Sequence, residues 1–157
     1  MTRLGLWIAT VILVLDQSTK WWVLNYVLME SNTTLSFTPF LSIVRVWNRG
    51  ISFGILGGEE ALSPLLLALL AFSVSFILMI WLSRTGRPWV CWGIGLIIGG
   101  ALGNGVDRLR HGAVFDFLDF HVLGTHWPAF NLADMAITVG VGMILIDALM
   151  ERQELPK

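Results

Sequence analysis

Four stretches of the chain are almost continuously apolar, and shorter polar segments separate them. The apolar stretches cover approximately residues 4–26, 63–83, 88–106 and 132–150. Each is close to the roughly 20 residues that an α-helix needs to cross the hydrocarbon core of a bilayer. The pattern predicts a membrane α-helical fold with four transmembrane helices, in a single domain over residues 1–157.

The composition supports a membrane protein and excludes several other classes. The chain is 55% hydrophobic and only 13% charged, with a mean hydropathy of +0.74. An ordinary soluble domain has about 25% charged residues, so this chain cannot cover its surface for water. The eight tryptophans suit the headgroup level of a bilayer. No basic patch indicates a nucleic-acid partner.

Two longer loops, approximately 27–62 and 107–130, connect the spans on the side away from the termini. Polar and apolar residues alternate in Leu35–Thr38, Ile43–Trp47 and Ala113–Phe120, a pattern typical of half-buried strands. We therefore expect a small sheet on the membrane surface and a surface loop within 27–62 that closes over bound substrate. Lysine and arginine divide evenly between the two sides, but those on the terminal side occupy shorter segments. This favours cytoplasmic termini in a multi-pass arrangement, with the sheet and the site at the outer face.

Ionisable residues gather in and beside the spans, where they are costly and therefore candidates for function. Asp16 and Lys20 share a helix face at positions i and i+4, as expected of a structural ion pair. The segment from Gly103 to Asp134 has four carboxylates, two arginines and two asparagines. These are Asp107, Asp116, Asp119, Asp134, Arg108, Arg110, Asn104 and Asn131.

Asp116 and Asp134 are the candidate catalytic pair. Asp134 follows Asn131 by three residues, as in a capping box, so its carboxylate would be held at the start of the fourth helix. Two carboxylates a few ångströms apart cannot both ionise and would share one proton near neutral pH. One could then accept a proton from water while the other donates to a carbonyl oxygen, which hydrolyses a peptide bond without a metal or a covalent intermediate.

Two other chemistries have weaker support. Residues 50–54 match G-x-S-x-G, with Asp116 and then His121 or His126 in the order of a serine hydrolase, but that fold needs a large parallel sheet. His111, His121 and His126, with Asp119, could suggest a metal, yet their spacing does not resemble a zinc site. We expect no metal and no other cofactor.

Two other function classes remain open. In a proton or cation transporter, Asp16, Lys20 and Asp134 would be relay groups, although such groups would be spread through several span interiors. In a structural membrane subunit, the small residues Gly95, Gly99 and Gly103 would form a helix-packing stripe.

Five segments, in order along the chain, resemble the prolipoprotein signal peptidase (signal peptidase II) family of bacterial plasma membranes. They are Asp16-Gln-Ser-Thr-Lys20, Asn48-Arg-Gly50 with Phe53, Gly100-Ala-Leu-Gly-Asn-Gly-Val-Asp-Arg108, Gly112-Ala-Val-Phe-Asp-Phe117 and Phe130-Asn-Leu-Ala-Asp134. The segments span most of the chain. One departure falls at Ile51 and Ser52, where the family often has two small residues, so the substrate contacts of that loop are open.

The resemblance implies a membrane aspartic endopeptidase that removes the signal peptide from prolipoproteins, cutting before a diacylglyceryl-modified cysteine. It implies Asp116 and Asp134 as the catalytic dyad and an extracytoplasmic β-cradle on the membrane. Substrate-binding or supporting roles fall on Asp16, Lys20, Asn48, Gly50, Asn104, Asp107, Arg108 and Asn131. The expected partners are lipid-modified precursors and membrane lipid, and the expected state is a monomer in the bacterial inner membrane.

Overall fold

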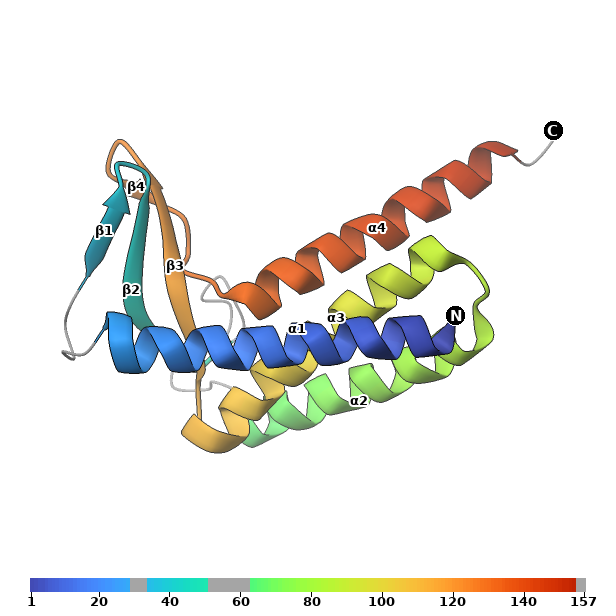
Figure 1. Cartoon of the computed structure of the whole chain (residues 1–157), viewed down its shortest axis with the longest axis horizontal. Coiled ribbons are helices and arrows are strands. Elements are labelled where there is room, and N and C mark those ends of the chain that lie inside the picture. The colour runs from blue at the N-terminus through green and yellow to red at the C-terminus, as the bar shows by residue number, and fades with distance from the viewer. Residues whose placement is uncertain (29–33, 51–62, 155–157) are drawn as a thin grey trace.

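Four long helices and a small antiparallel sheet make up the fold (Figure 1). The computed structural model describes residues 1–28, 34–50 and 63–154. The helices are α1 (Thr2–Trp22), α2 (Pro64–Arg84), α3 (Pro88–His111) and α4 (Leu132–Glu154), and a short π-helix (Val23–Val27) continues α1. The sheet lies at one end of the helices and both termini lie at the other (Figure 1). The start of α1 and the end of α4 therefore lie at the same end of the molecule, and their side of the membrane stays a prediction.

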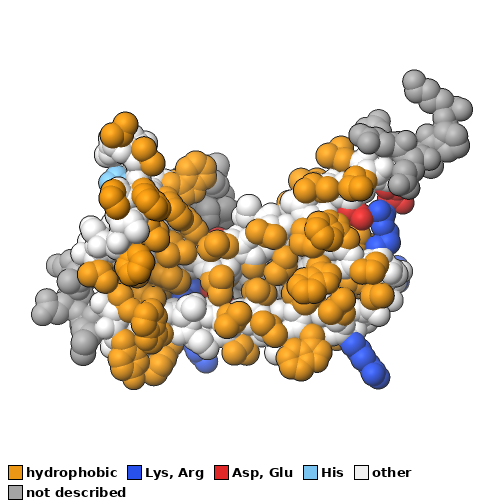
Figure 2. Space-filling view, turned by 45° about the horizontal axis from the view of Figure 1, so that its top comes forward, with side chains coloured by type: hydrophobic (Ala, Val, Ile, Leu, Met, Phe, Trp, Pro, Cys, Tyr) orange, Lys and Arg blue, Asp and Glu red, His pale blue; other side chains and the backbone are white. Residues whose placement is uncertain are grey.

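Three of these helices, α2, α3 and α4, are long and apolar enough to cross a membrane. The first predicted span is α1, which contains Arg3, Asp16 and Lys20 and is not among the three. Large apolar side chains, including those of Trp7 and Trp22, are nevertheless exposed along α1. Hydrophobic side chains cover the face of the molecule seen in Figure 2, over both the helices and the sheet.

The helix ends follow local signals in the sequence. The Ser63 hydroxyl accepts a hydrogen bond from the backbone N–H of Leu66 at 3.2 Å, and Pro64 takes the first helical position, as predicted for α2. Helix α3 ends where Gly112 adopts a left-handed conformation with φ of 68°. The helix therefore continues past residue 106, where the predicted third span ends, and into the predicted loop at 107–130. Asp107 and Arg108 lie within α3 and not in a loop.

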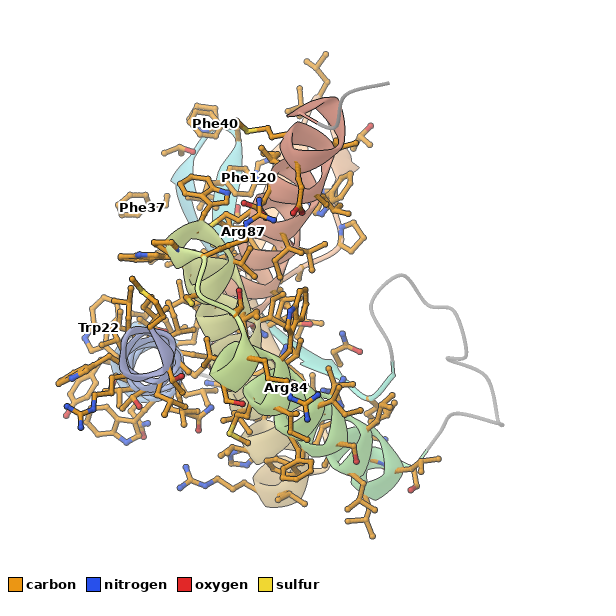
Figure 3. The ribbon with its side chains drawn as sticks, turned by 90° about the vertical axis from the view of Figure 1, so that its right-hand side faces the viewer. Trp22, Phe37, Phe40, Arg84, Arg87 and Phe120 are labelled. Atoms are coloured by element: carbon orange, nitrogen blue, oxygen red, sulfur yellow. The ribbon has the colours of Figure 1, made fainter. Side chains whose placement is uncertain are left out.

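Helix α3 packs against each of the other three helices, which have few contacts among themselves. Seen from the terminal end in Figure 3, α1 lies on one side of α3, with Trp22 projecting outwards. Close approach requires the small residues of α3. A Cβ on Gly95 would lie 2.6 Å from the carbonyl oxygen of Gly5, and one on Gly100 would lie 2.4 Å from that of Ala133. The predicted glycine stripe is thus a helix-packing surface.

The sheet has the strand order β1-β2-β3-β4, and each neighbouring pair is antiparallel. The strands are Leu35–Thr38, Leu41–Asn48, Val114–Val122 and Thr125–His126. The three predicted strand segments are confirmed. Phe115 and Phe117 of β3 pack with Val23 and Leu28, which follow α1, and this apolar cluster fixes the sheet to the end of the first helix. The predicted loop at 27–62 includes β1 and β2, while its parts 29–33 and 51–62, with the proposed lid, lie outside the described residues.

Candidate active site

Asp116 and Asp134 come together where β3 passes the N-terminus of α4. Asp116 is buried in the middle of β3, where it is opposite Val46 of β2. Asp134 is in the first turn of α4. The capping box is confirmed: the backbone N–H of Asn131 donates to Asp134 Oδ2 at 3.2 Å, and the backbone N–H of Asp134 donates to Asn131 Oδ1 at 3.0 Å.

Asn131 connects the two carboxyl groups. Its side chain is fully buried, and Nδ2 donates to Asp116 Oδ1 at 2.7 Å while its Oδ1 and backbone N–H engage Asp134. Asn48 of β2 donates to the other oxygen of Asp116 at 3.1 Å, and Asn104 of α3 donates to Asp134 Oδ1 at 2.8 Å. Each carboxyl group therefore accepts two hydrogen bonds from backbone or amide donors and cannot rotate freely.

Lys20 determines which end of the Asn104 amide faces Asp134. Asn104 Oδ1 accepts from Lys20 Nζ at 3.1 Å and from Asn131 Nδ2 at 3.2 Å. The ammonium group has only donors, so the Asn104 carbonyl must point to it and the NH₂ group must point to Asp134.

Lys20 is also the centre of a buried ion cluster. Its ammonium group lies 2.9 Å from Asp16 Oδ2 and 2.8 Å from Asp107 Oδ2. The other oxygen of Asp16 accepts from the backbone N–H of Ala133 in α4, and Asp107 Oδ2 accepts from that of Phe115 in β3. The predicted i, i+4 pair of Asp16 and Lys20 is confirmed. The cluster joins α1, α3, α4 and β3, and Asn104 connects it to Asp134.

Burial raises the pKa of Asp116 from its ordinary value of 3.8 to about 7. The negative charge of Asp134 contributes to this rise after burial, while the hydrogen bonds from Asn48 and Asn131 and the charge of Lys20 oppose it. Asp116 therefore holds a proton below neutral pH.

Arg108 also contacts Asn104, through the backbone of that residue. Its guanidinium donates to the carbonyl oxygens of Asn104 at 3.3 Å and Gly50 at 3.1 Å, and it interacts electrostatically with Asp134 and Asp116. The backbone N–H of Gly50 in turn donates to Asn48 Oδ1 at 3.0 Å. Arg108 thus links the end of β2 to the dyad.

Asp134 is among the lining residues of two hollows. One, of about 300 Å³, has polar walls at Asn48, Asn104 and Arg108. It continues along apolar side chains of α2, α3 and α4: Leu67, Leu70, Ala71, Val74, Ile97, Ala101 and Ile137. The other, of about 680 Å³, lies between the 127–130 segment and α4. The first hollow therefore leads along an apolar wall to the Asp134 carboxyl group.

All ten predicted site residues belong to one hydrogen-bonded assembly. Sequence reasoning missed Gln17, whose Nε2 donates to Asp107 Oδ1 at 2.9 Å and to Asp16 Oδ2 at 3.2 Å. Its position directly after Asp16, within one turn of Lys20, was the available signal.

The alternative chemistries do not match the observed contacts. The residues at 51–54 of the G-x-S-x-G match lie outside the described part of the chain. Asp116 hydrogen bonds to asparagines, whereas His121 contacts Ser42 and His126 contacts Asp119. The proposed Asp–His pair of a serine hydrolase is thus not assembled by these residues. Asp16, Lys20 and Asp134 belong to one cluster at one end of the helices. A proton or cation relay in a transporter would instead be spread through several span interiors.

The chain matches known proteins over nearly its whole length. Residues 8–150 match the family model described as signal peptidase (SPase) II. A lipoprotein signal peptidase of Rhodopseudomonas palustris is 42% identical over 154 residues, covering 94% of this chain and 93% of the relative. One of Coxiella burnetii is 38% identical and covers 96% of this chain and 93% of its own length.

Solved structures agree with this match. A bacterial membrane enzyme determined by the in meso method at 2.3 Å resolution superposes with a TM-score of 0.83 at 29% identity, covering 98% of this chain and 92% of that one. A second, at 1.9 Å resolution, gives a TM-score of 0.77 at 30% identity, with 92% of each chain covered.

Proposed function

The chain belongs to the signal peptidase II family, and from this premise we propose that it is an aspartic endopeptidase of the bacterial plasma membrane. It removes the signal peptide from prolipoproteins by cleaving before a diacylglyceryl-modified cysteine, with water activated by Asp116 and Asp134. In this proposal α1 also crosses the membrane, so that the chain has four spans. The termini are cytoplasmic, the sheet and the dyad lie on the outer side, and the enzyme acts as a monomer without a cofactor. The observation that carries the proposal is the pairing of two carboxyl groups through buried Asn131, beside an apolar hollow.

The reaction follows from the unequal surroundings of the two acids. Asp116 begins protonated and Asp134 ionised. Asp134 accepts a proton from water while the water oxygen attacks the scissile carbonyl carbon. At the same time Asp116 donates its proton to the carbonyl oxygen. The resulting diol collapses when Asp116 takes a hydroxyl proton and Asp134 delivers its proton to the leaving nitrogen. Both acids then return to their starting states.

The supporting residues keep these roles fixed. Asn131 and Asn104 hold the two carboxyl groups in a geometry that needs little rearrangement during the reaction. Arg108 and Asn48 lie at the polar end of the apolar hollow, where the peptide next to the scissile bond would pass. The signal helix and the acyl chains of the substrate can stay in apolar surroundings, so binding requires little desolvation of polar groups.

The test is cleavage of a purified precursor by the purified chain in detergent with excess chelator present. We expect cleavage directly before the diacylglyceryl-modified cysteine, and little or none in a matched precursor that lacks the lipid. A cysteine-to-serine precursor is the control for the lipid attachment site. Loss of cleavage with the chelator would contradict metal-free hydrolysis, and a dispensable lipid would contradict the substrate class.

The rate of cleavage should depend on the protonation of Asp116. Because its pKa is raised to about 7, kcat/KM should fall as pH rises above 7, to roughly a tenth of its plateau one pH unit higher.

Asn48→Ala removes a hydrogen bond that lowers the pKa of Asp116, so the alkaline limb of kcat/KM should move to higher pH whatever the change in maximal rate. A pH–rate profile from pH 5 to 9 measures the alkaline limb of the unmodified chain and of the variant. An unmoved limb would remove Asp116 from the role of proton donor.

A further inference from the structure

A second cluster of chemically active side chains lies at the far end of β3, apart from the dyad. His121 and His126 are directly opposite each other across the β3–β4 hairpin. A two-residue turn fixes this register, with φ of 51° at Leu123 and 82° at Gly124. Directly opposed residues project from the same face of a sheet, and the two imidazole rings are 5.0 Å apart between centroids.

The tautomer of His126 is set by Asp119. Nδ1 of His126 is 2.9 Å and 3.0 Å from the two carboxylate oxygens of Asp119, which is only 8% exposed. A carboxylate accepts hydrogen bonds, so Nδ1 carries the hydrogen and Nε2 keeps its lone pair. The His126 side chain is 59% exposed. Carboxylate–histidine–metal triads orient metal-binding imidazoles in this way.

The tautomer of His121 is set by two serines. Nε2 of His121 is 3.0 Å from the Ser42 hydroxyl, which donates its own hydrogen to Ser36 Oγ at 3.4 Å. With Ser42 donating to Ser36, the Ser42 oxygen accepts from His121, and this arrangement places the ring hydrogen on Nε2 and the lone pair on Nδ1. Each histidine thus presents one unprotonated ring nitrogen.

Both rings line a hollow of about 510 Å³, together with Thr125 and apolar side chains that include Phe120, Trp127 and Phe130. Among the described residues, neither lysine nor arginine lines this hollow, so none of them places a fixed positive charge there. Among the described residues no group of three or more histidine, cysteine or acidic side chains could hold a metal ion. A metal in this hollow would therefore have two protein ligands, with water completing its coordination.

From these contacts we propose that His121 and His126 form a two-histidine site for a divalent transition-metal ion such as Cu²⁺ or Zn²⁺. Neutral imidazole suits both ions, and Cu²⁺ should bind more tightly. Asp119 is a positioning residue that acts through His126. Asp119 and His121 are separated from Asp116 by odd numbers of positions along β3, so they lie on the opposite face from the dyad. The site is thus separate from the peptidase centre and leaves metal-free hydrolysis unaffected.

The test is titration of the purified full chain, freed of metal, with CuCl₂ and with ZnCl₂ in detergent and a non-coordinating buffer at pH 7.5. We expect one Cu²⁺ per chain with Kd below about 100 µM, and weaker binding of Zn²⁺. His121→Asn or His126→Asn should weaken binding about tenfold or more. Asp119→Asn keeps both imidazoles and should also weaken it by about tenfold.

Two controls distinguish this site from binding elsewhere. His111→Asn alters a histidine outside the hollow, and Asp116→Asn alters the dyad, so both should keep the affinity of the unmodified chain. The electron paramagnetic resonance spectrum of the unmodified chain with Cu²⁺ needs no variant and should show coupling to two imidazole nitrogens. Absence of stoichiometric Cu²⁺ binding, a spectrum without nitrogen coupling, or equal affinity in the His121→Asn and His126→Asn variants would overturn the proposal.

Discussion

Replacing Asp116 or Asp134 with asparagine is expected to lower kcat for precursor cleavage by about 10³-fold or more, because each acid transfers a proton in both halves of the proposed reaction. Asparagine keeps the size of the side chain but can neither supply nor accept that proton. The measurement is single-turnover cleavage of a lipid-modified precursor. Near-normal cleavage by either variant would remove that residue from the dyad.

The stability of Asp116→Asn should separate loss of chemistry from loss of fold. A folded-state pKa of about 7, above the ordinary 3.8, means that ionisation of Asp116 opposes folding increasingly as pH rises from about 4 through 7. Asparagine removes this effect, although one amide hydrogen now faces a donor, Asn48 or Asn131. The variant's melting temperature relative to the unmodified chain should therefore improve from pH 5 to pH 8.

The same strand provides a matched control. Asp119 is also a buried acid of β3, but it pairs with His126 on the face away from the dyad. Asp119→Asn should therefore cleave the precursor at close to the normal rate. A loss as large as that of Asp116→Asn would show that any buried acid of this strand is required, and the dyad assignment would lose its support.

Local signals predicted much of this molecule. The Ser63 cap, the Asn131–Asp134 capping box and the ion pair between Asp16 and Lys20 each depend on residues within four positions of one another. Backbone geometry makes such neighbours meet in any helix. The strands were also predictable, because alternation along one strand reports its two faces. The end of α3 was missed since the charged residues Asp107 and Arg108 looked like a loop, although Asp107 pairs with Lys20 and Arg108 donates to backbone carbonyl oxygens.

Contacts between residues far apart in the chain could not be predicted from the sequence pattern. Nothing near Asn131 in the chain indicates that one amide would contact both Asp116 and Asn104. Similarly, Gln17 became a candidate only when its contact with Asp107, 90 positions away, was seen. The family resemblance supplied the residues of the site, but only the packing of α1, α3, α4 and β3 explains why those polar residues occur together.

That packing leads to the largest expected change in stability, which is for Lys20→Met. The Lys20 side chain is 4% exposed, and its ammonium group forms ion pairs with Asp16 and Asp107, which are themselves buried. Removal of one partner from a buried ion cluster leaves uncompensated charge and typically costs about 3–5 kcal/mol. The Asn104 amide would also lose the group that sets its orientation, so precursor cleavage should fall in the fraction that still folds. Unfolding in mixed micelles of increasing denaturing detergent measures the first effect, and cleavage per folded molecule the second.

Arg87→Met is the matched control, because Arg87 is likewise a cation between two carboxylates. It lies at the terminal end of the helices, 2.8 Å from Asp147 and 2.6 Å from Glu151, and its side chain is 43% exposed (Figure 3). Solvent screens these two ion pairs, so their loss should destabilise the fold far less than loss of the buried Lys20 cluster and should leave cleavage unchanged. Combining Lys20→Met with Asp16→Asn and Asp107→Asn removes the buried charges together and should recover much of the lost stability. Recovery of stability without recovery of cleavage would assign Lys20 to the orientation of Asn104 as well as to the fold. Equal stability losses for Lys20→Met and Arg87→Met would show that burial of the Lys20 cluster carries no particular energetic weight.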